Sequence, residues 1–271
     1  MKKVLLSLAL VLGLTVPVFA NDTELKMATT TSTADTGLLD YLTPIFKKDT
    51  GYDLKYVSVG TGEALAMGRN GDVDVVLVHA KPSEEKFVAD GYGVARIEVM
   101  YNDFIVVGPK GVLPYSNDIK ETLNQVFAKK VKWVSRGDDS GTDKKEKGIW
   151  KNLGINASEN LNYKESGSGM GASLSMADEL GACILTDRGT YLKMKSDSSV
   201  KLDLEIICEK APDLLNQYGI IAVSPAKYPD TNITTATAFI DWIVSDRIQK
   251  IIGEFGKEKY GQSLFVPNAK K

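Results

Sequence analysis

Hydroxyl-bearing residues and glycines gather at three points where a strand pattern gives way to a helix pattern. These points are residues 28–33 (Ala-Thr-Thr-Thr-Ser-Thr), 59–63 (Val-Gly-Thr-Gly-Glu) and 135–142 (Ser-Arg-Gly-Asp-Asp-Ser-Gly-Thr). The first backbone N–H groups of a helix lack intrahelical partners and carry the positive end of the helix dipole, so neighbouring hydroxyls complete a cradle for an anion. The three turns therefore predict an anion-binding site.

The third turn carries the strongest signal because it contains an arginine. Arg136 offers five N–H donors in a fixed fork that suits an oxyanion. Ser140 and Thr142 add hydroxyl donors, and Gly141 has no side chain to keep its backbone amide away from a ligand. The aspartates at 138–139 could orient the guanidinium or cap the helix, and a surface ion pair with them is the alternative role for Arg136.

The other turns also contain hydrogen-bond donors, but each of them is a weaker signal when taken alone. A single N-cap residue would account for only one hydroxyl, whereas residues 29–33 all carry hydroxyls. The run therefore favours a binding turn over simple helix capping. The turn at 59–63 lacks the remaining glycine and the acidic partner of a dinucleotide site. A glycine-rich loop at 166–171 is either a flexible connector or a fourth contact. The predicted ligand-binding residues are Thr30, Thr31, Ser32, Thr61, Arg136, Ser140, Gly141, Thr142 and Ser168.

The rival hypothesis is a secreted hydrolase built on His79, the one histidine of the chain. His79 follows a predicted strand, and the sequence contains no Gly-x-Ser-x-Gly nucleophile elbow that would supply a partner serine. A lone polar residue at a strand end is more often structural or a binding contact. We therefore predict a binding protein and not an enzyme.

The elements that position these turns follow a βαβ rhythm. Residues 54–59 and 73–78 are β-branched runs that flank a helix pattern at 62–70. Apolar residues line one face of a predicted helix at 37–49, and a last predicted helix at about 235–255 also has an apolar face. The second half of the chain repeats the theme, which indicates parallel α/β sheets.

Two strands closed by proline, at residues 104–109 and 218–225, stand apart from this series. Strands of this kind suit crossings in which the chain leaves a first lobe, builds a second and returns. We predict lobe 1 at residues 21–104 plus 219–271 and lobe 2 at residues 105–218. Open α/β sheets bind ligands at the carboxyl ends of their strands, so turns from both lobes can converge across a cleft and favour its closed form.

The first twenty residues predict export. Lys2 and Lys3 precede an apolar run at 4–14, and Val18 and Ala20 stand at the cleavage positions, which is the pattern of a signal peptide at residues 1–20. No later stretch stays apolar for the roughly 20 residues that a membrane span needs. We expect a soluble, monomeric periplasmic protein. We also expect no lipid anchor, because no cysteine lies near the predicted cut after Ala20.

The charge balance excludes nucleic acid as a partner. The chain has 33 Lys and Arg against 35 Asp and Glu, and it shows no basic tail or stripe. An acidic protein must attract an anion through local donors rather than through a global field. Arg136 is expected to be the one full positive charge at the site.

The chain has two cysteines, Cys183 and Cys208. An oxidising periplasm would allow them to pair, and the alternative is two buried thiols in neighbouring strands. Their spacing does not separate these possibilities. Two cysteines and one histidine do not suggest a zinc site, and no metal cation is expected.

Five motifs resemble the periplasmic tungstate-binding proteins of ABC uptake systems. They are residues 29–32 (TTTS), 71–80 (GDVDVVLVHA), 99–104 (VMYNDF), 135–142 (SRGDDSGT) and 185–191 (LTDRGTY), and they span most of the mature chain. The resemblance implies a type II periplasmic-binding-protein fold, in which two α/β lobes with mixed sheets flanked by helices are joined by two crossover strands. It also implies tungstate as the ligand, no cofactor, and delivery to a membrane permease with its ATPase.

The resemblance carries over to individual residues where the motifs match. The turn at 30–32, Arg136 and Thr142 are expected as tungstate contacts, and residues 140–142 also resemble the Ser-Gly-Thr turn of phosphate-binding relatives. Two departures concern the outer part of the site. Asp143 stands in place of an expected histidine, and the serine-glycine loop before the second-lobe helix replaces a glutamine-containing loop.

The choice of oxyanion follows partly from chemistry. Tungstate is a dianion whose oxygens only accept hydrogen bonds at neutral pH, so a ring of donors suits it. Molybdate has nearly the same shape and charge, and phosphate stays an alternative because Asp138 could accept its hydrogen. The preference for tungstate therefore rests on the resemblance.

Overall fold

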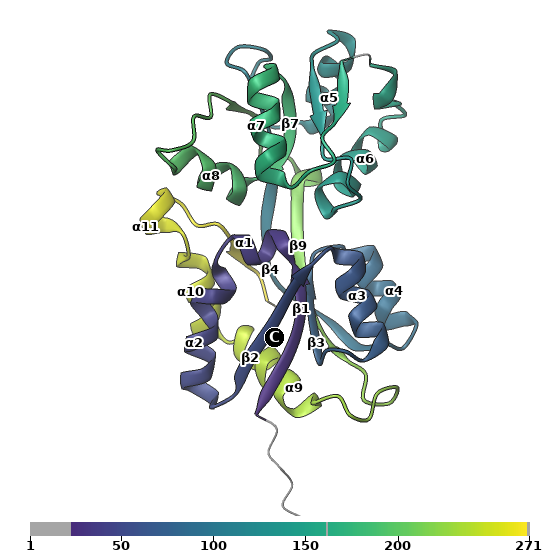
Figure 1. Cartoon of the computed structure of the whole chain (residues 1–271), viewed down its shortest axis with the longest axis vertical. Helices are drawn as coiled ribbons and strands as arrows, with labels where there is room; N and C mark the ends of the chain where they lie inside the picture. Colours follow the sequence, from purple (N-terminus) through teal and green to yellow (C-terminus); the bar gives the residue numbers. More distant parts are fainter. Residues whose placement is uncertain (1–22, 161, 270–271) are drawn as a thin grey trace, which may run out of the picture.

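The computed structural model describes residues 23–160 and 162–269 and shows two lobes joined by two long strands (Figure 1). Strand β4 (Gly93–Gly108) leads from the first lobe to the second, and β9 (Leu215–Val223) leads back. The predicted signal peptide at 1–20 lies outside the described residues. No helix in the described part of the chain has the length and apolar character to cross a membrane.

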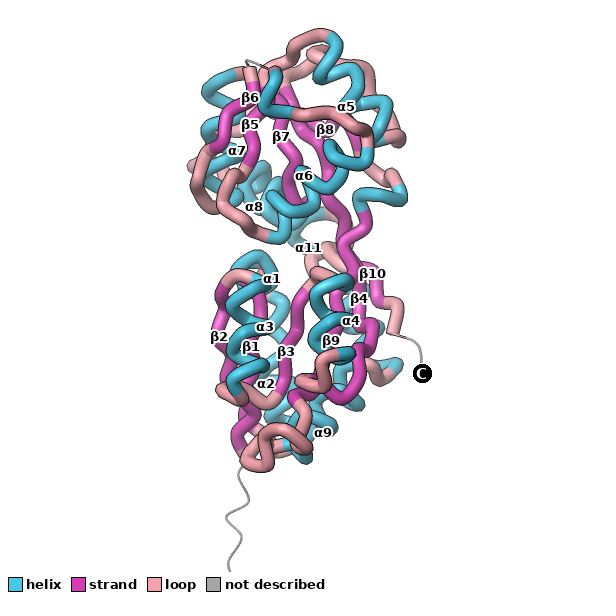
Figure 2. The backbone as a smooth tube through the Cα atoms, turned by 90° about the vertical axis from the view of Figure 1, so that its right-hand side faces the viewer, coloured by secondary structure: helices cyan, strands magenta, loops and turns pink. Residues whose placement is uncertain are grey.

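Lobe 1 contains a mixed sheet with helices on both faces (Figure 2). Its own strands are β1 (Glu24–Thr30), β2 (Asp53–Val59), β3 (Val75–Val78) and β10 (Val266–Pro267). Its helices are α1 (Thr31–Asp35), α2 (Leu38–Thr50), α3 (Thr61–Asn70), α4 (Lys81–Ala89), α9 (Ile233–Ile243), α10 (Asp246–Glu254) and α11 (Lys257–Tyr260). The strand order is β2-β1-β3-β9-β4, with β1 parallel to β2 and β3 and β9 antiparallel to its neighbours.

Lobe 2 repeats this plan on a smaller sheet. Its own strands are β5 (Trp133–Ser135), β6 (Tyr163–Glu165), β7 (Cys183–Asp187) and β8 (Glu205–Cys208). Its helices are α5 (Ile119–Ala128), α6 (Gly141–Asn152), α7 (Met170–Leu180) and α8 (Arg188–Ser196), with short 3₁₀ helices at Ala157–Glu159 and Pro212–Leu214. β5 pairs parallel with β6 and β7, whereas β7 and β8 pair antiparallel with β4.

Strand β4 changes partner where the two lobes meet. It pairs with β9 as far as Asp103, which lies opposite Leu215, and it pairs with β7 from Phe104, which lies opposite Asp187. The strand predicted at 104–109 is thus the last part of a longer strand that belongs to both sheets. The predicted lobe boundaries stay a proposal, which this change of partner supports.

Each lobe has its core on both sides of the sheet. In lobe 1, Phe46 of α2 and Phe239 of α9 are fully buried and meet edge to face, with ring centroids 4.9 Å apart. Leu65 of α3 and Phe87 of α4 fill the opposite side. The apolar spacing read from the sequence therefore indicated the correct inward faces for α2 and α9.

The helix predicted at about 235–255 is wrong as a single element. It is two helices, because Ser245 adopts the extended conformation at φ −66° and ψ 146° between them. The Ser245 hydroxyl donates to the Trp242 carbonyl at 2.6 Å and so satisfies the end of α9. Ser245 makes no side-chain cap for α10, but Asp246 places a negative charge in the first turn of α10, where it suits the helix dipole.

Cys183 and Cys208 are free, buried thiols. They belong to β7 and β8, which both pair with β4. A Cβ atom added to Gly108 of β4 would lie 2.6 Å from Cys183 Sγ, so this sulfur packs directly on the strand. Burial raises the pKa of the Cys183 thiol to about 12. Of the two possibilities left open by the sequence, the structure shows the buried thiols.

The aromatic cluster of lobe 1 predicts a large effect for one core substitution. Phe239→Ala should lower the free energy of unfolding by about 3–5 kcal/mol, because it removes a fully buried ring and leaves a cavity. Val94→Thr, at a position 57% exposed, should change it by less than about 0.5 kcal/mol. Urea denaturation measures both, and equal losses would contradict this account of the core.

Candidate functional site

The predicted turns lie at the facing ends of the two lobes (Figures 1 and 2). They join β1 to α1, β2 to α3, and β5 to α6. A Cβ atom added to Gly141 would lie 3.0 Å from His79 Cε1 and 3.8 Å from Thr61 Oγ1. The start of α6 in lobe 2 therefore meets lobe 1, and turns of both lobes share one cleft.

The first turn forms a cluster of hydroxyls around His79. Thr30 is buried and caps α1, with its Oγ1 accepting a hydrogen bond from Thr33 N at 3.2 Å. The same Oγ1 lies 2.6 Å from Thr33 Oγ1 and 3.0 Å from His79 Nε2. Ser32 is half-buried, with its Oγ 3.2 Å from His79 Nε2, and Thr31 is exposed. The run of hydroxyls thus supplies one helix cap and a polar cluster beside the cleft.

A cavity of about 480 Å³ opens in the cleft beside these contacts. The lining residues from the predicted turns are Thr61, Gly62 and Gly141. His79, which follows β3, and three lysines, Lys81, Lys144 and Lys145, join them. Arg136 does not line this cavity, so the expectation that it is the one full positive charge at the oxyanion site stays a prediction, while the lysines add positive charge to the cleft. Sequence reasoning missed these lysines, although two of them directly follow the Ser-Gly-Thr turn.

The cleft lysines differ in how their charge is neutralised. Lys144 Nζ lies 2.9 Å from Asp139 Oδ2. Lys145 Nζ instead donates to the Leu215 carbonyl at 3.2 Å and forms no ion pair with any residue in the described ranges. Burial lowers the pKa of Lys145. Helix α6 thus brings to the cleft an ammonium that forms no ion pair in the described ranges, although the charge of Asp213 acts to raise its pKa.

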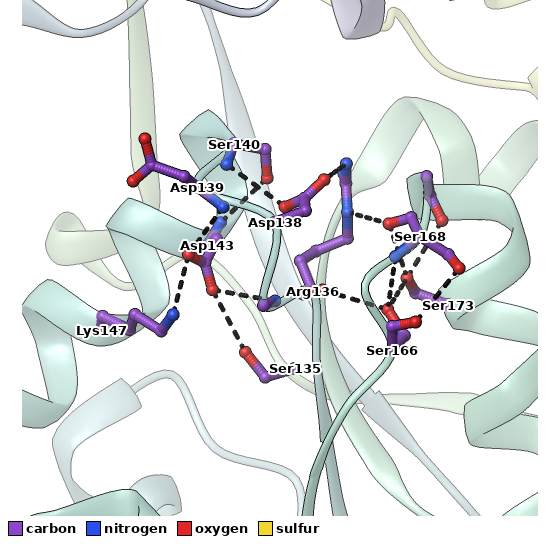
Figure 3. A network of polar contacts seen from close by, with 12 residues as sticks. Ser135, Arg136, Asp138, Asp139, Ser140, Asp143, Lys147, Ser166, Ser168 and Ser173 are labelled. Carbon is purple, nitrogen blue, oxygen red and sulfur yellow. Dashed lines mark hydrogen bonds and ion pairs between the residues drawn. The ribbon is translucent and has the colours of Figure 1, made fainter.

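Arg136 is held by two neighbouring loops (Figure 3). Its Nε donates to the Ser168 carbonyl at 2.7 Å, and its Nη2 pairs with Asp138. Asp138 Oδ1 also accepts from Ser140 N at 3.2 Å. Burial raises the pKa of Asp138, but the Ser140 hydrogen bonds and the Arg136 charge outweigh burial and leave the pKa below its ordinary value. Of the two aspartates considered, Asp138 is therefore the one that orients the guanidinium.

Asp143 fixes the third turn from the inside. Its Oδ1 accepts from Gly137 N at 3.0 Å, and its Oδ2 accepts from Asp139 N at 3.2 Å and from Lys147 Nζ at 3.0 Å (Figure 3). Ser140 caps α6 by accepting from Asp143 N at 3.3 Å. The position at which the sequence departs from the family thus holds a buried carboxylate that organises the loop around Arg136.

The serine-glycine loop of lobe 2 also supports Arg136. Ser166 Oγ donates to the Arg136 carbonyl at 3.2 Å and lies 2.7 Å from Ser173 Oγ (Figure 3). The Ser168 hydroxyl donates to the Ser166 carbonyl at 3.2 Å, so it is engaged within its own loop. The Ser168 carbonyl, rather than its hydroxyl, makes the contact to the guanidinium.

A buried carboxyl lies beneath the third turn and was missed from the sequence. Glu146 of α6 is 1% exposed, and its Oε1 accepts from Trp133 Nε1 at 2.9 Å, Trp150 Nε1 at 3.3 Å and Tyr163 hydroxyl at 3.0 Å. Burial raises its pKa to about 7, although these donors and Ser135 act to lower it. A charged residue among exposed lysines gave no sequence signal that it points inward.

The arrangement offers mainly hydrogen-bond donors to the cleft. Within the described ranges, no residue accepts from Arg136 Nη1 or from the backbone N–H groups of Gly141 and Thr142. Donors at a helix start and an arginine fork suit a ligand whose surface consists of acceptors. No cluster of three or more His, Cys, Asp and Glu side chains that could hold a metal ion occurs in residues 23–160 and 162–269.

Comparisons with known proteins agree with this geometry. A family model described as a PBP superfamily domain matches residues 17–247. The tungstate-binding protein TupA of Peptoclostridium acidaminophilum is 54% identical over 252 residues, which cover 90% of this chain and 86% of the relative. The structure of the tungstate-binding protein TupA from Desulfovibrio alaskensis G20 has a TM-score of 0.85 at 43% identity and covers 91% of this chain and 99% of that chain. The structure titled the tungstate ABC transporter from Geobacter sulfurreducens has a TM-score of 0.76 at 44% identity, with 86% and 98% covered.

Two α/β lobes with mixed sheets, joined by two crossover strands and separated by a cleft, form a type II periplasmic-binding-protein fold. The fold class predicted from the sequence is confirmed. This chain belongs to the family of the TupA tungstate-binding proteins, as its motifs indicated.

The buried Glu146 predicts a pH dependence of stability. Its pKa of about 7 in the folded protein exceeds the ordinary value of 4.5, so the stability it contributes is present below pH 4.5 and is lost as the pH rises through about 7. Glu146→Gln cannot ionise and escapes this loss. The free energy of unfolding of the variant, relative to wild type, should therefore rise between about pH 5 and about pH 8.

Urea denaturation across this pH range measures the difference. Glu258→Gln, at an exposed position, is the control. Parallel pH profiles for wild type and Glu146→Gln would contradict the assignment.

Proposed function

We propose that this chain captures tungstate in the interlobe cleft and delivers it to the membrane permease of an ABC transporter. The observation that carries the proposal is the convergence of donors from both lobes, with Arg136 fixed between Asp138 and Ser168. The relatives whose names state tungstate binding support the choice of ligand. We further propose that the protein acts as a periplasmic monomer after removal of residues 1–20, without a cofactor and without enzyme activity.

The proposed contacts come from donors of both lobes. Lobe 1 supplies the hydroxyl turn and the start of α3, and lobe 2 supplies the guanidinium and the start of α6. The proposed ligand-binding residues are Thr30, Thr31, Ser32, Thr61, Arg136, Ser140, Gly141, Thr142 and Ser168. Because neither lobe alone holds all donors, the ligand favours the state in which both lobes contact it.

The carboxylate oxygens of the third turn already accept hydrogen bonds from the protein. This favours a fully deprotonated oxyanion over hydrogen phosphate. Both oxygens of Asp138 accept hydrogen bonds, from Arg136 and from Ser140 N. Both oxygens of Asp143 are likewise engaged by donors of the loop. A hydrogen-bearing phosphate would have to compete for these oxygens, whereas tungstate needs only donors. Molybdate has the same needs, so it is the nearest competitor.

One set of contacts resembles the catalytic site that the rival hydrolase hypothesis requires. Ser32 Oγ lies 3.2 Å from His79 Nε2, and His79 Nδ1 lies 3.0 Å from Asn216 Oδ1, which is the order nucleophile, base and orienting group. However, Thr30 Oγ1 lies closer to the same nitrogen, and burial lowers the pKa of His79 to about 4. A general base works best with a pKa near the operating pH. The geometry therefore favours binding.

Arg136 gives the direct test of this proposal. Arg136→Ala should weaken tungstate binding by about 1.5–3 kcal/mol, more than tenfold, because a charge-assisted contact is lost. Arg136→Lys keeps the charge but not the fork, so its affinity should fall between the two. Calorimetric titration measures each, with Arg247→Lys on the outside of lobe 1 as the control. Unchanged affinity in Arg136→Ala would remove Arg136 from the site.

Contact between the lobes predicts different outcomes for two glycines of α6. The methyl group of Gly141→Ala would lie 3.0 Å from His79 Cε1, so one of the two must move, and tungstate affinity should fall by about 1 kcal/mol or more, roughly fivefold. At Gly148 nothing lies within 4 Å of the added atom. Gly148→Ala should keep the affinity and stabilise the helix by about 0.5–1 kcal/mol. Equal affinities in both variants would contradict the interlobe contact.

A further inference from the structure

A chain of buried side chains runs from His79 into the crossover strands. Asn216 of β9 donates from Nδ2 to Asn102 Oδ1 of β4 at 2.8 Å. Asn102 Nδ2 in turn donates to the Tyr218 hydroxyl at 3.3 Å. The His79 ring packs on Tyr218, with centroids 4.9 Å apart, and its Cε1 edge faces Gly141 of lobe 2. The imidazole is therefore contacted on one face, at its Cε1 edge and at both of its nitrogens.

The amide orientation of Asn216 determines which nitrogen of His79 carries the hydrogen. Because Asn216 Nδ2 is committed to Asn102, its Oδ1 faces His79 Nδ1, at 3.0 Å. An amide oxygen only accepts, so Nδ1 must donate. A neutral imidazole has one N–H, and its other nitrogen, Nε2, is then an acceptor with one lone pair. Burial, which lowers the pKa of His79 to about 4, is consistent with a neutral ring at neutral pH.

The hydroxyls near Nε2 compete for that single lone pair. Thr30 is buried, so its hydrogen must find a partner inside the protein, and Nε2 lies 3.0 Å from its Oγ1. The two lone pairs of Thr30 Oγ1 then accept from Thr33 N at 3.2 Å and from Thr33 Oγ1 at 2.6 Å. This arrangement satisfies Thr30 completely. Ser32 Oγ also lies 3.2 Å from Thr30 Oγ1, but because both lone pairs of Thr30 are taken by Thr33, the hydrogen of the half-buried Ser32 has no free acceptor in this arrangement.

We propose that His79 is a positioning residue of the oxyanion site, which binds Thr30 through an unprotonated Nε2 and thereby leaves the Ser32 hydroxyl to donate to the ligand. The inference rests on the proposed function and refines it. In place of the direct ligand contact proposed for its hydroxyl above, Thr30 then supports the first turn, and Ser32 contacts the oxyanion. If the side-chain amides of Asn102 and Asn216 were both flipped, the hydrogen of His79 would be on Nε2. An N–H would then face the hydroxyls instead.

The single histidine makes the proton position directly observable. A long-range ¹H–¹⁵N correlation spectrum of the whole ¹⁵N-labelled protein shows one imidazole, because the chain has one histidine. We expect Nδ1 in the protonated range and Nε2 in the unprotonated range at neutral pH, both without ligand and with saturating tungstate. A hydrogen on Nε2, or a doubly protonated ring, would overturn the proposal. The ligand-free spectrum tests the position of the hydrogen on His79 even if tungstate does not bind. A failure of this inference can therefore be distinguished from a failure of the proposed function.

Paired substitutions test the consequence for binding. The amide of Gln at position 79 can reach the place of Nε2 and accept there, whereas the shorter Asn can replace only Nδ1. His79→Gln should therefore retain more tungstate affinity than His79→Asn, and the reverse order would contradict the proposal. Ser32→Ala should lose about tenfold in affinity, because a hydrogen bond to a charged ligand is removed.

A hydroxyl outside the cleft provides the matched control. Thr43 of α2 donates to the Leu39 carbonyl within its own helix, so Thr43→Ala should keep the tungstate affinity of wild type. Thermal unfolding of the ligand-free variants separates lost binding from lost structure. If Ser32→Ala binds tungstate as Thr43→Ala does, Ser32 is not the donor and the proposal fails.

Discussion

The hydrogen bonds that hold Arg136 are the constraint on which the rest of the site depends. A free arginine side chain samples many rotamers, but here the Ser168 carbonyl and Asp138 fix the guanidinium from two sides. Asp143 and Ser140 fix the backbone that carries it. Folding therefore already restricts the conformational freedom of the Arg136 side chain, so ligand binding does not have to restrict it. This pre-organisation favours strong recognition of a small anion.

The same constraint explains how an acidic protein attracts a dianion. The chain carries a net charge of −2, so a long-range field does not favour an anion. The attraction comes instead from short-range donors at helix starts and from cleft cations, among which Lys145 has no carboxylate partner in the described part of the chain. Lys144 and Lys145 lie one turn into α6, whereas Lys81 is the first residue of α4.

Local patterns predicted the fold class and the strand-to-helix turns that the structure brings to one cleft. Strand-to-helix turns rich in glycine and hydroxyls have a local physical cause, so residues 28–33 and 135–142 were recognised from the sequence. The direction in which each side chain points in the folded protein could not be predicted in this way. Nothing in a run of charged residues at 143–147 says that Asp143 and Glu146 turn inward while Lys144 and Lys145 face the cleft. Similarly, the contact of His79 with Asn216 joins positions 137 residues apart, which only the crossover strands bring together.

The central claim is that the cleft recognises an oxyanion made only of acceptors, and tungstate in particular. Competition calorimetry of the ligand-free protein with tungstate, molybdate, sulfate and phosphate tests it most directly. The account predicts tight one-to-one binding of tungstate, displacement by molybdate ahead of the other anions, and weak or absent binding of phosphate at neutral pH. Phosphate binding as tight as tungstate binding would contradict it.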